Sequence, residues 1–467
     1  MLSPLLILLV GMVVVLGLIL VLRVNAFLAL ITAAMVVSLL AGGPVDERIA
    51  RVAVAFGTMA GQLGIPIAMA AIIGKCLMES GAADRIVRAF LGMLGERRAP
   101  EALASGGFVL AIPVFFDTVF YLLVPLARSL FRRTGRHYML YLGAIATGGM
   151  VAHSLIPPTP GPLMVAVSLE VDLGLMILVG VIVGLPTAAA GLAVARLIDR
   201  RMPIPMRPYT GGEEAGEATA AADDRPLPPL VLSALPIVLP VALIALDRVA
   251  QALAQAQTEA LGEPGAWTRW SEVTAALGNP ASALFLAAVI AMATLKRQRG
   301  LSLAALGRST EAALLSGGVI ILITSAGGAF GDMLRVAGVG PALEAVIDAE
   351  ATGAGLLVLL FGAAVSSVLK IAQGSSTVAM LTTAGIFAPI APLAGCDPVY
   401  LAMAIGNGAV IGSWMNDSAF WVFARMGVLT EAETLKSWTV VLVAAGLCGV
   451  LLTLLAAWLV PWPFSAP

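Results

Sequence analysis

The feature that most constrains this chain is a series of long apolar runs. A helix of about 20 apolar residues is long enough to cross a hydrocarbon core of about 30 Å. The runs near this length are residues 4–22, 26–43, 64–80, 173–198, 230–248, 280–295, 316–334 and 437–460. We read the first run as a membrane helix, because it has no basic segment and no clear cleavage site of a signal peptide. Together the runs predict an all-α polytopic membrane protein.

The composition excludes the main classes of soluble protein. Charged residues are 12% of the 467 residues and hydrophobic residues are 60%, whereas about 25% of a soluble domain is charged. The net charge of −1 offers no basic field to a nucleic acid. The three cysteines stand apart in apolar runs, which argues against a disulfide framework or a metal cluster. The sequence also has no Walker loop and no nucleophile elbow. We therefore expect no enzyme activity, no cofactor and no nucleic-acid partner.

Four further apolar stretches are interrupted by glycine, proline and polar residues, at 101–127, 138–170, 355–391 and 398–423. They are too broken for regular spans and too apolar for loops. The positive-inside rule places most Lys and Arg residues on the cytoplasmic side. This arrangement results when the N-terminus is outside and when the stretches 101–127 and 355–391 each enter and leave the membrane on the same side. We therefore predict about 11 transmembrane helices, two re-entrant hairpins and broken helices, with both termini outside.

The two halves of the chain resemble each other at a nearly constant offset. Leu77-x-x-x-Gly81 recurs as Leu334-x-x-x-Gly338, 257 residues later. A broken segment that begins at Gly149 recurs from Gly408, 259 residues later. Each match alone is weak, but their order and shared offset predict an internal repeat; chance similarity of apolar sequence is the alternative.

A linker that is rich in proline and acidic residues separates the halves. We predict a first repeat half at 1–198, a cytoplasmic linker at 199–229 and an inverted second half at 230–467. The stretches 45–60 and 300–315, at matching positions, predict amphipathic helices that lie in the membrane interface. Inverted repeats with broken helices are typical of secondary transporters, whose binding site lies at the repeat interface near the midplane.

The segment 153–162 is the first break that could carry chemistry. It holds four prolines in six residues, and proline cannot continue a helix because it lacks an N–H group. Freed backbone groups are tolerated in a membrane only inside protein or beside a water-filled cavity, and the N-terminus of the next half-helix would favour an anion. A solvent loop is the alternative. From this break we assign four residues to the substrate site: Ser154, Pro157, Pro158 and Thr159.

The second break, 406–418, collects polar residues in an otherwise apolar region. Asp417 is costly at membrane depth, which makes it a functional candidate. It could carry a proton, bind a substrate hydroxyl or cap the following helix, and Asp is a good N-cap. Ser413 and Asn416 could donate hydrogen bonds to substrate hydroxyls.

The two hairpin tips fall at equivalent repeat positions and are also polar. Asp117 lies at the first tip, and Lys370 precedes the second. A glycine followed by three hydroxyl residues predicts a tight turn and a helix start, where N–H and hydroxyl groups could hold a carboxylate. Lys370 could add a cation, pair with Asp117 or extend to the membrane surface. Polar contacts between membrane helices are the alternative for the hydroxyl groups. The residues assigned to the substrate site here are Lys370, Gly374, Ser375, Ser376 and Thr377.

Across nearly its whole length the chain resembles the gluconate:proton symporter family, also called the gluconate permease family. The resemblance rests on His153-x-x-x-Pro157-Pro158-x-Pro160-Gly161-Pro162, Asn416-Asp417-x-x-Phe420-Trp421, Gly374-Ser-x-Thr377-Val-Ala and Gly74-Lys75 followed by Ser80-Gly81. It implies proton-coupled uptake of gluconate or a related hydroxy acid across the bacterial inner membrane. It also implies a homodimer in which a scaffold holds a transport domain with two opposed hairpins that moves as an elevator.

We therefore expect a secondary active transporter in the lipid bilayer, with a small organic anion as substrate. The expected proton carriers are Asp117, Asp417 and His153, because a carrier near neutral pH is a carboxyl group or a histidine in a suitable environment. A sodium-coupled organic-anion carrier is the alternative, since carbonyl groups freed at the breaks could bind Na⁺. An anion channel is disfavoured, because a pore needs a continuous polar lining.

Overall fold

The computed structural model describes residues 3–208, 226–261, 266–344, 354–415 and 417–460. Throughout these residues the regular structure is helical, and eight helices are long and apolar enough to cross a membrane. Three shorter apolar helices cover Pro4–Ile19, Ala26–Leu40 and Ser376–Pro392. The prediction of an all-α polytopic membrane fold with broken helices is confirmed.

The helices are α1 (Pro4–Leu16), α2 (Ala26–Leu40), α3 (Val45–Glu79), α4 (Ala82–Leu94), α5 (Ala99–Leu110), α6 (Phe116–Thr134), α7 (Tyr138–Leu155), α8 (Pro160–Ser168), α9 (Leu173–Arg201), α11 (Leu230–Leu261), α12 (Ala266–Gly278), α13 (Pro280–Arg299), α14 (Leu303–Val336), α15 (Val339–Glu344), α16 (Ala354–Gln373), α17 (Ser376–Phe387), α18 (Pro398–Gly408), α19 (Ser418–Gly427), α20 (Glu431–Thr434) and α21 (Val440–Leu459). Two π-helical turns, η1 (Gly17–Val21) and η4 (Leu435–Thr439), and two 3₁₀ segments, η2 (Glu96–Arg98) and η3 (Ala388–Ala394), complete the order.

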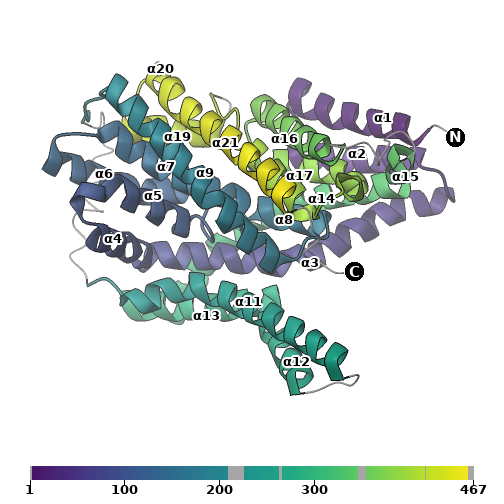
Figure 1. Cartoon of the computed structure of the whole chain (residues 1–467), viewed down its shortest axis with the longest axis horizontal. Coiled ribbons are helices and arrows are strands. Elements are labelled where there is room, and N and C mark those ends of the chain that lie inside the picture. Colours follow the sequence, from purple (N-terminus) through teal and green to yellow (C-terminus); the bar gives the residue numbers. More distant parts are fainter. Residues whose placement is uncertain (1–2, 209–225, 262–265, 345–353, 416, 461–467) are drawn as a thin grey trace.

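Two long helices, α3 and α14, pack against each other, with α2 against α14 and α13 against α3. The helices α11, α12 and α13 form a layer on one side of the molecule, beside α3 and α4 (Figure 1). The helices α5, α7, α9 and α21 pack in sequence as a second group, which lies opposite that layer in Figure 1. Most residues of the helix breaks and of the hairpin tips are buried within this packed body.

The long helix α3 corrects one prediction from the sequence. Residues 45–60 are the first part of a continuous 35-residue helix that has Pro66 inside it, and 300–315 overlaps the start of the 34-residue α14. The polar face of α3 has a structural role, because Arg48 donates to the carbonyl oxygens of Leu39 (2.9 Å) and Gly43 (2.9 Å). Those carbonyl groups lie at or just beyond the C-terminus of α2, where arginine is a favourable partner. Separate interfacial helices are therefore wrong for these stretches.

Helix breaks occur where the sequence predicts them. Both hairpins are helix–break–helix units: α5 and α6 flank residues 111–115, and α16 and α17 flank 374–375. Both broken segments are present as well, with 156–159 between α7 and α8, and 409–417 between α18 and α19. The same order of elements thus occurs twice along the chain. The helix α9 continues to Arg201, past the predicted start of the linker, and residues 209–225 of that linker lie outside the described residues.

Glycine lets the first arm of each hairpin approach the adjacent broken helix closely. In the first half, a Cβ at Gly148 of α7 would overlap the carbonyl oxygen of Ala104 in α5. In the second half, a Cβ at Gly408 of α18 would overlap the carbonyl oxygen of Ala363 in α16. Small residues are the usual means by which membrane helices pack, since lipid gives apolar side chains no reason to associate. Such close contacts pack the first arm of each hairpin against the broken helix of the same half.

We predict that Gly148→Ala and Gly408→Ala each destabilise the protein by about 1–3 kcal/mol or more, the usual effect of overpacking. The matched control is Gly318→Ala in α14, where an added Cβ meets nothing within 4 Å and alanine is the better helix former. Thermal unfolding of the purified proteins in one detergent checks this. Equal melting temperatures for all three variants would contradict the assigned packing.

Candidate functional site

A polar cavity of about 350 Å³ lies where both hairpin tips meet α7 and the second break. Its volume is in the range of small-molecule sites. The lining residues are Phe115, Phe116, Asp117, Met150, His153, Lys370, Gln373, Gly374, Ser375, Ser376, Thr377, Asp417, Ser418 and Ala419. The sequence placed eight of these in its candidate site, so the fold brings most of the predicted residues together from four separate segments.

A buried ion pair lies at the centre of the cavity lining. Lys370 Nζ lies 2.5 Å from Asp417 Oδ2, and the two side chains are 1% and 6% exposed. The same ammonium group donates to the carbonyl oxygen of Gly374 at 2.7 Å, a position where a cation suits the end of α16. Since an isolated charge is very costly in a low-dielectric interior, each partner makes burial of the other possible. The pair joins the second hairpin to the second break.

Asp417 also caps α19, as one of the sequence readings predicted. Its Oδ1 atom accepts from the backbone N–H of Ala419 at 3.0 Å, which satisfies one of the free donors at a helix start. Its Oδ2 atom accepts from the hydroxyl group of Ser413 as well as from Lys370. This carboxylate therefore has three donors from three places in the chain.

Ser413 lies behind the cavity wall and is fully buried. It accepts a hydrogen bond from Trp438 Nε1 at 2.7 Å, and its carbonyl oxygen accepts from Thr439 Oγ1 at 2.7 Å. The structure thus places Ser413 in support of Asp417, whereas the sequence predicted that it contacts substrate. Asn416, predicted beside it, lies outside the described residues.

The tip of the second hairpin presents a helix start to the cavity. Gly374 has φ +83, a conformation that glycine adopts without strain. Ser375 caps α17 by accepting from Val378 N–H at 3.3 Å, and Ser376 donates to the carbonyl oxygen of Ala409 at 3.0 Å. The N-terminal end of α17 therefore adds positive potential to the wall that holds Lys370.

Asp117 and His153 face this tip from the first half. Asp117 lies in the first turn of α6 and is partly buried. Among the residues that the structure describes, none donates a hydrogen bond to it. His153 packs edge-on against Phe115, with ring centroids 6.0 Å apart. Its buried Nδ1 atom, and the buried Nε2 atom of Gln373, have no hydrogen-bond partner in the described part of the chain.

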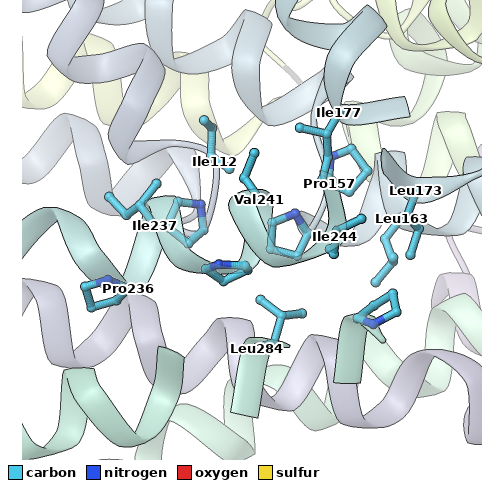
Figure 2. Close-up of a pocket in the computed structure, with 14 residues that line it drawn as sticks. Ile112, Pro157, Leu163, Leu173, Ile177, Pro236, Ile237, Val241, Ile244 and Leu284 are labelled. Atoms are coloured by element: carbon cyan, nitrogen blue, oxygen red, sulfur yellow. The ribbon is translucent and has the colours of Figure 1, made fainter. Parts of the chain in front are cut away.

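The residues of the first break, 153–162, that the sequence assigned to the substrate site lie outside the polar cavity. Pro157 and Pro158 line an apolar pocket together with side chains of α9, α11 and α13, and Figure 2 shows Pro157 near Ile177 and Ile244, among apolar groups. Thr159 donates to the carbonyl oxygen of Ile156 at 2.7 Å, so its hydroxyl group stabilises the break. Ser154 is fully buried and is absent from the cavity lining. None of these four residues reaches the polar cavity.

Sequence reasoning missed two kinds of residue. Phe115, Phe116 and Met150 line the cavity, but an apolar side chain in an apolar run looks the same whether it lines a cavity or fills a core. Trp438 lacked a signal for the same reason. Gln373 follows Lys370 in the same hairpin motif, and this neighbourhood was the signal that could have found it.

Helices broken beside a polar cavity are typical of multi-pass membrane transporters. The family model described as GntP family permease matches residues 3–459. The chain therefore belongs to the GntP permease family, whose members are permeases and not enzymes.

Two relatives support this assignment, and one solved structure shares the fold. The chain is 33% identical to a gluconate permease of Pseudomonas aeruginosa over 93% of each chain. It is 32% identical to the Gnt-II system L-idonate transporter of Escherichia coli, over 96% of this chain and 98% of the relative. The crystal structure of the Alcanivorax borkumensis YdaH transporter, with 14% identity, has a similar fold, with a TM-score of 0.62 over 94% of this chain and 98% of that one.

We predict that Lys370→Met or Asp417→Asn alone destabilises the protein by about 3–5 kcal/mol, because each leaves one buried charge unpaired. The double variant recovers much of that loss, since asparagine keeps an oxygen for the α19 cap. The control is Arg88→Met, in the more exposed Arg88–Asp84 pair, with a change below about 1 kcal/mol. Thermal unfolding measures all four variants. A double variant as unstable as the sum of the singles would contradict the pairing.

Proposed function

We propose that this protein carries gluconate or a related small hydroxy-carboxylate across the bacterial inner membrane by proton-coupled symport. The observation that carries the proposal is the buried Lys370 beside the helix start at 374–377, in a cavity that also holds two carboxyl groups. The relatives named for gluconate and for L-idonate support a sugar acid as the substrate class.

The charges of the cavity give a reason for coupling. Lys370, Asp117 and Asp417 are the ionisable acids and bases on the described wall besides His153, so the empty cavity has a formal charge of −1 with a neutral histidine. A monoanionic substrate would change this formal charge to −2, which is unfavourable because like charges in one cavity repel each other. A proton taken up with the substrate offsets that charge. By linkage, substrate and proton then favour each other's binding equally.

The substrate carboxylate binds at the second hairpin tip in this proposal. The N–H groups at the start of α17, the hydroxyl group of Thr377 and the ammonium group of Lys370 form its positive wall. Two groups without a hydrogen-bond partner among the described residues, His153 Nδ1 on α7 and the Gln373 amide at the end of α16, suit the hydroxyl groups of a sugar acid. A molecule of this class fits into a site of about 350 Å³ and leaves room for water.

Several larger features remain proposals of the same kind. We propose two inverted repeat halves, 1–198 and 230–467, joined by a cytoplasmic linker at 199–229, and both termini outside. The recurrence of the element order supports the repeat. We also propose a homodimer with an elevator motion of the hairpin-bearing domain, which rests on the family resemblance.

Uptake into proteoliposomes tests the proposal. We expect labelled gluconate or L-idonate to accumulate when the lumen is made alkaline, and to stop accumulating when a protonophore collapses the gradient. Replacing Na⁺ with K⁺ on both sides leaves accumulation unchanged if protons couple. Accumulation that needs a Na⁺ gradient would establish the sodium-coupled alternative, and no accumulation of any hydroxy acid in either gradient would contradict the proposal.

A further inference from the structure

We infer that the two acidic residues of the cavity have different roles. Asp117 takes up the coupled proton, whereas Asp417 is a positioning residue that keeps Lys370 at the hairpin tip. A hydrogen-bonded chain from Trp438 through Ser413 holds Asp417 in that role. The inference rests on the proposed function and assigns its proton site.

The donors around Asp417 carry the first step. Lys370 and Ser413 donate to Oδ2, and the N–H of Ala419 donates to Oδ1 at 3.0 Å. All of these groups are buried. A proton on Oδ2 must displace an ammonium or hydroxyl donor, and a proton on Oδ1 must weaken the α19 cap. Three donors therefore stabilise the ionised carboxylate.

Trp438 fixes the donor-to-acceptor direction of the hydrogen bonds that run through Ser413 to Asp417. An indole N–H donates and never accepts, so the 2.7 Å bond from Trp438 Nε1 to Ser413 Oγ occupies an acceptor position of that hydroxyl group. The hydrogen of Ser413 is then directed to Asp417. Trp438 is itself fully buried, and its ring packs at 5.2 Å from Phe116 and 5.1 Å from Phe423. It lies in the π-helical turn η4, a feature that often marks functional sites.

Asp117 is in the opposite situation. It lines the same cavity, and no described residue donates a hydrogen bond to its carboxylate. The charged and titratable groups that face it are Lys370, Asp417 and His153. Protonation there displaces no hydrogen bond and relieves repulsion from Asp417. Lys370 remains paired, so the ammonium group stays at the tip while the proton and the substrate enter.

Phe116 belongs to the packing around both acidic residues of the site. It is the residue before Asp117, and its ring contacts Trp438 at the start of the chain that ends on Lys370. The first hairpin tip and the support of the second tip thus share one buried aromatic side chain.

Two transport modes of the protein in liposomes separate the roles. Counterflow exchanges labelled for unlabelled gluconate without net proton movement, whereas accumulation requires the pH gradient. We expect Asp117→Asn to retain counterflow within about threefold of the wild type and to lose gradient-driven accumulation. Asp417→Asn lowers counterflow at least about tenfold, the loss expected when a charge-assisted contact of about 1.5–3 kcal/mol is misplaced.

The conservative variant Trp438→Phe tests the positioning chain. It keeps an aromatic ring and removes only the donor, and we expect a KM for gluconate counterflow raised about 3–10-fold with the maximal rate little changed, as for one lost hydrogen bond of about 1 kcal/mol. The matched control, Trp421→Phe, removes an indole bond to the carbonyl oxygen of Met415 (2.7 Å) outside this chain and leaves the KM unchanged.

Several outcomes would overturn the inference. Asp117→Asn that still accumulates gluconate along a pH gradient excludes Asp117 as the carrier. If Asp417→Asn keeps normal counterflow but loses accumulation, the two roles are reversed. If Trp438→Phe and Trp421→Phe have equal KM values, the hydrogen bonds from Trp438 through Ser413 do not position Asp417. Each of these leaves the proposed function intact. A wild-type protein without gluconate counterflow overturns the proposed function, and the inference with it.

Discussion

The buried ion pair between Lys370 and Asp417 is the interaction on which the cavity depends. Neither charge is tolerable alone at this depth, so the end of α16 and the start of α19 must stay together. Because Lys370 also binds the carbonyl oxygen of Gly374, the pair sets the shape of the hairpin tip as well. The charged group that stabilises the structure also lines the cavity.

The breaks themselves obey the rule that backbone polar groups in a membrane must find partners within the protein. Ser366 and Ser367 of α16 donate to the carbonyl oxygens of Ile405 and Gly408, at 2.8 and 3.0 Å. Trp414 donates to the carbonyl oxygen of Ile371 at 2.8 Å. Side chains of the hairpin and of the broken helix thus satisfy each other's carbonyl groups. Several polar residues in these segments therefore stabilise the fold itself.

The sequence predicted what local chemistry controls. The proline cluster at 157–162, the glycine–hydroxyl turn at 374–377 and the clustered polar residues of 406–418 are local signals, so the breaks and hairpin tips could be found, and with them Asp117, Lys370 and Asp417. Tertiary contacts decide the rest: whether Pro157 faces a polar or an apolar pocket depends on α11, which no local pattern reveals. The role of Trp438 and the continuity of α3 through its polar first turns were hidden for the same reason.

The central claim is that the substrate anion and a proton occupy one cavity together. Calorimetric titration of gluconate into the purified protein at a single pH, in two buffers that differ in ionisation enthalpy, counts the protons taken up on binding. Uptake near one proton for each gluconate bound is the predicted result. Binding heats that are the same in both buffers, and so indicate no proton uptake, would contradict the claim.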